Sequence, residues 1–192
     1  MPNIEIKART TDLTKARVTA QKLQTRYIGF LHQIDTYFHT PSGRLKLREI
    51  DGKTFQLIPY AKDYKAGPMR SDYALIEISD AALVKTLFDR ILGIEAVVDK
   101  RREVFLIDNV RVHLDEVAGL GTFIEFEAVY GADEEVTAQT EKVARLMETF
   151  GIRPGDLCDR SYVDYLLVAA RGNVSPSESP QRSSTSSTAH PN

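Results

Sequence analysis

Charged side chains of like sign stand two positions apart in several segments whose other residues favour β-strands. Because side chains alternate across a strand, the two members of each pair project from the same face. The like-sign pairs are Lys46 with Arg48, Lys100 with Arg102 and Glu125 with Glu127, and the mixed pair Glu5 with Lys7 has the same spacing. If these faces converge, the sheet encloses a cavity with cationic walls and an acidic patch.

An antiparallel sheet with one solvated face also produces charged alternation, and for any single pair this is the simpler interpretation. On such a face opposite signs normally mix, because they pair across strands. Here the signs are segregated by segment, so like charges about 7 Å apart repel unless a group of opposite sign lies between them. A multivalent anion offsets the repulsion within the basic pairs, and a divalent cation offsets the repulsion within the acidic pair. Together these two ions describe a polyphosphate with its metal.

The chain of 192 residues suits one domain, and its 42% hydrophobic and 27% charged residues are typical of a globular protein. A net charge of −2 gives no overall attraction to nucleic acid or to an anionic membrane. The N-terminus lacks a signal-peptide pattern, and no apolar run is long enough to span a bilayer. The single cysteine, Cys158, excludes an intrachain disulfide. These features predict a cytoplasmic protein without a nucleic-acid or membrane partner.

Helical spacing of apolar residues predicts a helix over 13–28 with Asp12 as its N-cap, and a second helix from Ser79 or Asp80 to Gly93. Further helices are expected at 134–150 and about 160–169. From residue 171 onward, Gly, Ser, Thr and Pro dominate. Such a segment buries too little apolar surface to offset its ordering entropy. We therefore expect one domain over 1–170 and a disordered tail over 171–192.

Asp51-Gly52 between two alternating segments predicts a β-hairpin of strands 44–50 and 54–60. Other strands are expected near 32–38, 73–78, 96–107, 109–116 and 122–130. Short turns between consecutive strands imply antiparallel pairing, and sheet closure is one way to shelter edges. The expected fold is α+β, built around a β-barrel or a strongly curved antiparallel sheet.

Asp115 precedes the turn that leads to Glu125 and Glu127, so a hairpin would bring three carboxylates together. Hard oxygen ligands of this kind suit Mg²⁺ or Mn²⁺. The histidines have no zinc-type spacing, and a lone strand histidine such as His113 is more often structural. A Gly-x-x-x-x-Gly-Lys loop is absent from the sequence, and Ser161 lacks a recognisable base partner, so neither a P-loop nor nucleophilic catalysis is indicated.

Short motifs follow one another in a fixed order along the chain. They are Asn3-Ile-Glu5-Ile-Lys7, Gln33 to Phe38, Leu45 to Arg48, Tyr60 to Lys62 with Gly67 to Ser71, Lys100 to Phe105, His113 to Asp115, and Leu120 to Glu127. In this order they resemble the CYTH family of class IV adenylyl cyclases and thiamine triphosphatases over about residues 3–170. Two positions depart from the family pattern: Asn3 replaces the first Glu of Glu-x-Glu-x-Lys, and Lys46 replaces the first Arg of Leu-Arg-x-Arg.

The resemblance implies an eight-stranded antiparallel tunnel with flanking helices that binds a triphosphate, and it also implies a possible homodimer. Catalytic roles fall on Lys7, Arg48, Lys62 and Arg102, substrate binding on Lys46, Arg70, Lys100 and Arg111, and binding of Mg²⁺ or Mn²⁺ on Glu5, Asp115, Glu125 and Glu127.

The resemblance implies three candidate functions that share this charged cavity. The segment Gln33 to Phe38 and the Gly67-Pro68 loop favour a class IV adenylyl cyclase, which converts ATP to cyclic AMP and pyrophosphate. The first alternative is a triphosphatase acting on inorganic tripolyphosphate, thiamine triphosphate or a nucleoside triphosphate. The second is a polyphosphate- or nucleotide-binding protein without turnover, since Asn3 replaces a family acid.

Overall fold

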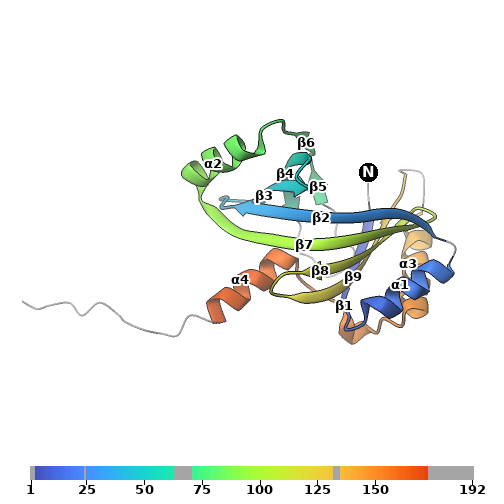
Figure 1. The fold of residues 1–192 in the computed structure, drawn as a ribbon. Helices are drawn as coiled ribbons and strands as arrows, with labels where there is room; N and C mark the ends of the chain where they lie inside the picture. Colours follow the sequence, from blue (N-terminus) through green and yellow to red (C-terminus); the bar gives the residue numbers. More distant parts are fainter. Residues whose placement is uncertain (1–2, 24, 63–70, 132–134, 173–192) are drawn as a thin grey trace, which may run out of the picture.

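A computed structural model describes residues 3–23, 25–62, 71–131 and 135–172. One strongly curved sheet forms the body of the molecule, with helices along its outside and at one end (Figure 1). The strands are β1 (Asn3–Arg9), β2 (Arg26–Phe38), β3 (Arg44–Ile50), β4 (Thr54–Lys62), β5 (Ser71–Tyr73), β6 (Ile76–Glu77), β7 (Ile94–Ile107), β8 (Val110–Val117) and β9 (Gly121–Val129). The helices are α1 (Leu13–Lys22), α2 (Ala81–Leu92), α3 (Val136–Phe150) and α4 (Tyr162–Gly172), with a 3₁₀ turn at Pro154–Asp156.

All strand pairings are antiparallel, and the strand order is β1-β9-β8-β7-β2-β3-β4-β5 with β6 also on β4. The predicted α+β class with flanking helices is confirmed. Among the described residues the sheet is not closed into a barrel, because its two ends, β1 and β5, do not pair with each other. The three-residue β5 offers few backbone groups for a closing partner, so the tunnel is an open, curved trough.

The outer face of this sheet is apolar and covered by helices, whereas the inner face is charged. Helices α1 and α3 cover the outer face of β1, β8 and β9, and α2 covers that of β2 and β3 (Figure 1). The outward core side chains include Ile4, Val112, Leu114, Phe126, Phe38 and Leu47. Since successive side chains alternate, burial of these residues against helices forces the charged neighbours inward.

The predicted turn and cap signals are present. Asp51 and Gly52 have φ of 51° and 64°, the left-handed pair that a tight hairpin requires between β3 and β4. The carboxylates of Asp12 and Asp80 accept backbone hydrogen bonds at 2.8 and 2.9 Å in the first turns of α1 and α2. These local interactions fix the ends of the elements independently of the cavity.

Two sequence-based boundaries were wrong. The helix predicted over 13–28 ends at Lys22, and β2 begins at Arg26. Pairing of Tyr27 with Phe105 of β7, and the strand propensity of aromatic and β-branched residues, outweigh the helical spacing there. The strand predicted over 73–78 is split into the short β5 and β6.

Helix α4 runs to Gly172, across the expected domain boundary at residue 170. Residues 173–192 lie outside the described residues, so the disordered tail stays a prediction. No helix in the described ranges is long and apolar enough to cross a membrane.

Candidate active site

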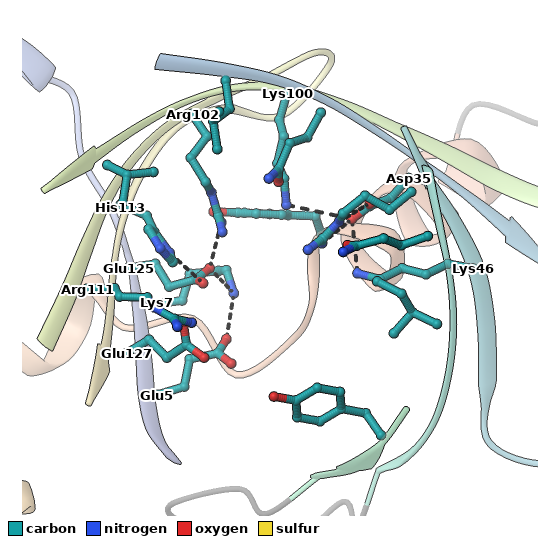
Figure 2. A pocket seen from close by; sticks show the side chains of 18 of the residues that line it. Glu5, Lys7, Asp35, Lys46, Lys100, Arg102, Arg111, His113, Glu125 and Glu127 are labelled. Atoms are coloured by element: carbon teal, nitrogen blue, oxygen red, sulfur yellow. Dashed lines mark hydrogen bonds and ion pairs between the residues drawn. The ribbon is translucent and has the colours of Figure 1, made fainter. Parts of the chain in front are cut away.

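The inward-facing side chains of β1 to β4 and β7 to β9 line one cavity of about 440 Å³, a volume typical of small-molecule sites (Figure 2). Six basic and four acidic side chains contribute to its walls. They are Lys7, Lys46, Arg48, Lys100, Arg102 and Arg111, with Glu5, Asp35, Glu125 and Glu127. The charged faces predicted from the sequence therefore converge on one space.

Asp35 on β2 is the shared partner of three basic side chains. Its carboxylate accepts hydrogen bonds from Arg48 at 2.7 and 2.8 Å and from Lys46 at 3.0 Å, and Lys100 Nζ lies 3.7 Å away. Asp35 is 1% exposed and stands directly opposite Arg48 in the β2–β3 ladder. Asp35 thus offsets the repulsion within the Lys46–Arg48 pair and part of the charge of Lys100, a role that the sequence pattern assigns to a bound anion.

This sharing changes the pKa values of the groups involved. Burial alone would raise the pKa of Asp35, but Lys46, Arg48 and Lys100 hold it well below its ordinary value. Burial and the neighbouring Arg48 lower the pKa of Lys46 to about 8. Burial and Arg102 lower the pKa of Lys100 to about 7. One carboxylate neutralises only part of the positive charge of three basic side chains, and a bound anion would neutralise more of it.

Glu125 on β9 forms the second ionic centre, on the opposite side of the cavity (Figure 2). Its Oε2 lies 3.0 Å from Lys7 Nζ and 3.3 Å from Arg102 Nη2, and its Oε1 lies 3.1 Å from His113 Nδ1. The strand register explains these contacts, because Glu125 stands opposite both Lys7 and His113. The predicted acidic patch is therefore paired with basic side chains of the protein itself.

The protonation states in this second centre follow from the same contacts. Burial alone would raise the pKa of Glu125, but Lys7 and Arg102 hold it well below its ordinary value. Burial alone would lower the pKa of Lys7, yet Glu125 and Glu5 raise it. Burial and Arg102 lower the pKa of His113, so its neutral ring donates the Nδ1 proton to the Glu125 carboxylate.

Asp115 is bonded to Arg102 and Tyr162 and is absent from the cavity lining. Arg102 donates to its two oxygens at 2.7 and 2.6 Å, and the Tyr162 hydroxyl donates to Oδ2 at 2.7 Å. The residue is 0% exposed and is not part of the cavity lining. The geometry does not support the prediction that Asp115 joins Glu125 and Glu127 around a metal. Its carboxylate instead orients the guanidinium of Arg102.

Glu5 and Glu127 face each other across the β1–β9 ladder. Glu127 accepts from Asn3 Nδ2 at 3.0 Å and from Arg111 Nη1 at 3.2 Å, and Glu5 lies 3.1 Å from Lys7 Nζ. Asn3, which stands where the CYTH motif has a first Glu, therefore orients Glu127 through its amide.

The carboxylates have the right chemistry for Mg²⁺ or Mn²⁺ but do not form a complete cage. Across the described ranges, no three His, Cys, Asp or Glu side chains converge on one metal position. Mg²⁺ is commonly held by one or two carboxylates together with substrate phosphates and water. Glu5 and Glu127 therefore fit an ion shared with a phosphate ligand better than one held by protein alone.

Gln33 and Tyr162 also line the cavity, although the sequence predicts no individual role for either. Gln33 is 5% exposed, and its Oε1 is the only buried side-chain polar atom without a partner in the described part of the chain. The Tyr162 ring lies 4.6 Å from Lys7 Nζ and 5.4 Å from Lys100 Nζ. The period-two series Gln33, Asp35, Tyr37 carried a signal for the first of these, whereas nothing in the strand pattern pointed to Tyr162 on α4.

The remaining two predicted residues cannot be placed in the cavity. Lys62 ends β4, but its side chain is outside the described part of the structure, and Arg70 lies outside the described residues altogether. Their roles stay predictions.

This chain belongs to the CYTH domain family, whose match covers residues 1–162. A Methanocaldococcus jannaschii protein named "putative adenylate cyclase" is 25% identical over 173 residues, which cover 85% of this chain and 98% of that protein. A solved structure from Pyrococcus horikoshii shares the fold, with a TM-score of 0.76 and 22% identity over 85% of this chain and 98% of its own. A Hippeastrum protein described as a "putative adenylyl cyclase" with a dominant triphosphatase activity has a TM-score of 0.64 and 15% identity, covering 92% and 98%.

Proposed function

We propose that the cavity binds the triphosphate of ATP and that the protein converts ATP to cyclic AMP and pyrophosphate with Mg²⁺ or Mn²⁺. The observation that supports this proposal is the convergence of six basic side chains from β1, β3, β7 and β8 on one cavity that has only four carboxylates in its lining. Membership of the CYTH family and the name of the archaeal relative agree with a cyclase.

The two ionic centres would bind the phosphates in different ways. Lys46, Arg48 and Lys100 share one carboxylate, so phosphate oxygens can add to their coordination without displacing it. Arg102 is held by Asp115 in a fixed orientation, and a preoriented guanidinium needs little rearrangement to stabilise developing charge. In cyclisation, the ribose 3′ hydroxyl loses its proton to solvent and its oxygen bonds to the α-phosphorus, while the bond from that phosphorus to the bridging oxygen breaks. The pyrophosphate that leaves would be stabilised by these cations.

Glu5 and Glu127 would hold the metal, with Glu125 beside them. A bound Mg²⁺ or Mn²⁺ neutralises phosphate charge and lowers the pKa of a coordinated hydroxyl group. Asn3 and Arg111 keep Glu127 in place. The expected homodimer stays a prediction, since these contacts need only one chain.

Triphosphate hydrolysis is the second candidate, because the Hippeastrum relative is described with a dominant triphosphatase activity. Hydrolysis at the terminal phosphorus needs the same charges but a water nucleophile in line. Binding without turnover is the third candidate, since Asn3 replaces a family carboxylate.

A product assay separates the three candidates. Purified protein with Mg²⁺ or Mn²⁺ is offered ATP, tripolyphosphate or thiamine triphosphate, and cyclic AMP, pyrophosphate and orthophosphate are measured. We expect cyclic AMP and pyrophosphate from ATP, with a loss of about 100-fold or more in Arg102→Ala. The matched control is Arg101→Ala, on the exposed face of the same strand, which should retain activity. Orthophosphate without cyclic nucleotide would establish the triphosphatase, and binding without any product would establish the third candidate.

A further inference from the structure

Apolar side chains line the same cavity beside the charged ones. Ile28 and Leu31 on β2 and Val104 on β7 form one apolar group. Tyr73 at the end of β5 and Leu75, just before β6, form a second. Neither apolar group makes a favourable contact with the oxygens of an inorganic polyphosphate.

A β-bulge places Ile28 in the lining. In the β2–β7 ladder Tyr27 pairs with Phe105 and Gly29 with Val104, so Ile28 is an extra residue without an opposite partner. Bulges of this kind redirect a side chain and are frequent beside functional sites. Without the bulge, simple alternation would not put Ile28 and Leu31, three positions apart, on the same cavity.

The second apolar group follows from the β4–β5 pairing. Tyr73 stands opposite Tyr60, another residue of the cavity lining. Leu75 is two residues further along and so returns to the same side. The short edge strands thus add an apolar wall to the cavity.

The outer apolar residues of the cavity differ in exposure from the two cations on β7. Ile28, Tyr73 and Leu75 are 50%, 49% and 55% exposed, whereas Lys100 and Arg102 are 4% and 7% exposed. Lys100 and Arg102 therefore lie deep together with Val104, which is 8% exposed, whereas Ile28, Tyr73 and Leu75 lie near solvent. A ligand with a phosphate chain at one end and an apolar body at the other matches this gradient.

We propose that Ile28, Leu31 and Val104 on one side and Tyr73 and Leu75 on the other hold the aromatic head group of an organic triphosphate. This inference rests on the proposed function, because the triphosphate must occupy the charged part of the cavity. Burial of exposed apolar surface then favours organic triphosphates over inorganic tripolyphosphate. The subsite contributes through buried apolar area and shape, so it distinguishes a triphosphate that carries a head group from one that does not.

Calorimetric titration with ATP and with tripolyphosphate tests the subsite. EDTA is added to stop turnover, and the titrations are repeated with Mg²⁺ at low temperature. The full chain is compared with the double variant Ile28→Ser/Leu75→Ser. The matched control is Phe30→Ser, because Phe30 is 55% exposed on the same strand but does not line the cavity.

We expect the double variant to weaken ATP binding by about tenfold and to leave tripolyphosphate binding within about twofold. Phe30→Ser should change neither affinity. Equal losses for both ligands, or no loss for ATP, would overturn the head-group subsite while leaving the phosphate cavity intact. Failure of the unmodified protein to bind tripolyphosphate with or without Mg²⁺ would instead overturn the proposed function.

Discussion

Asp35 keeps three basic side chains close together in the absence of ligand. Breaking a buried ion pair on one side costs about 3–5 kcal/mol, because the remaining charges lose their partner. We expect Asp35→Asn to lower the free energy of unfolding by about 3 kcal/mol. Tripolyphosphate should restore part of this loss, since its oxygens replace the missing carboxylate. Denaturant unfolding with and without tripolyphosphate measures both effects, and a loss that the anion leaves unchanged would contradict this role.

Gln33 has an unsatisfied buried oxygen at the wall of the cavity. An unpartnered buried acceptor costs about 1–3 kcal/mol, and an apolar side chain of similar size removes that cost. Gln33→Leu is therefore expected to raise the free energy of unfolding by about 1 kcal/mol. Chemical denaturation provides the measurement, and a clearly destabilised variant would show that the amide makes a contact that this structure does not contain.

Lys46 and Lys100 make stability depend on pH. Their pKa values of about 8 and about 7 lie below the ordinary 10.5. Between about pH 7 and pH 10 the unfolded chain therefore binds more protons than the folded protein, and stability rises with pH. Denaturation at about pH 7 and pH 9.5 should show the increase, and Lys100→Met should reduce it. A stability that falls over this interval would contradict the lowered pKa values of these two ammonium groups.

The same two lysines link proton uptake to ligand binding. A triphosphate favours the charged ammonium form, so its affinity should fall as pH rises above about 8. Calorimetry at about pH 8 in two buffers of different ionisation enthalpy detects the proton directly.

At the scale of elements, α4 contributes one described residue, Tyr162, to the lining of the cavity. Its first residue, Tyr162, donates a hydrogen bond to Asp115, which in turn orients Arg102. Burial and the Asp115 carboxylate raise the pKa of Tyr162, so the hydroxyl remains a donor at neutral pH.

Tyr162→Phe tests this connection with little change in packing. We expect a loss of about 1 kcal/mol in stability. We also expect kcat to fall by a larger factor than KM changes, because the orientation of Arg102 matters most in the transition state. Tyr165→Phe is the control, since its hydroxyl bonds to Asp159 at 3.1 Å outside the cavity. Equal kinetic effects in the two variants would contradict the proposed role of Tyr162.

The strand pattern predicted most of this architecture, because the period-two charges, the Asp51-Gly52 turn and the aspartate caps are local signals. It misassigned residues 23–28, where strand pairing with distant β7 decides the structure. It also grouped Asp115 with the metal ligands. Asp115 instead accepts hydrogen bonds from Arg102 and from Tyr162, which is 47 residues away in sequence, and spacing along a strand cannot show the second contact.

For the molecule as a whole, the sheet places apolar side chains outside against helices and charges inside. This arrangement positions the cavity charges before a ligand arrives, since both ionic centres are already formed. It also concentrates like charges in one place, and a stability cost of that kind is typical of a functional site rather than of a structural core.

The central claim is that the cavity binds a triphosphate, and ligand-dependent thermal unfolding tests it most directly. Melting of the full chain is followed with about 1 mM tripolyphosphate, with and without Mg²⁺, against orthophosphate at equal ionic strength. Ligand at about 100 times its Kd adds about 2.7 kcal/mol, which for a chain of this size raises Tm by about 5 °C or more. We predict such a rise with tripolyphosphate, larger with Mg²⁺, and a much smaller one with orthophosphate. An unchanged Tm with tripolyphosphate, both with and without Mg²⁺, would contradict the account.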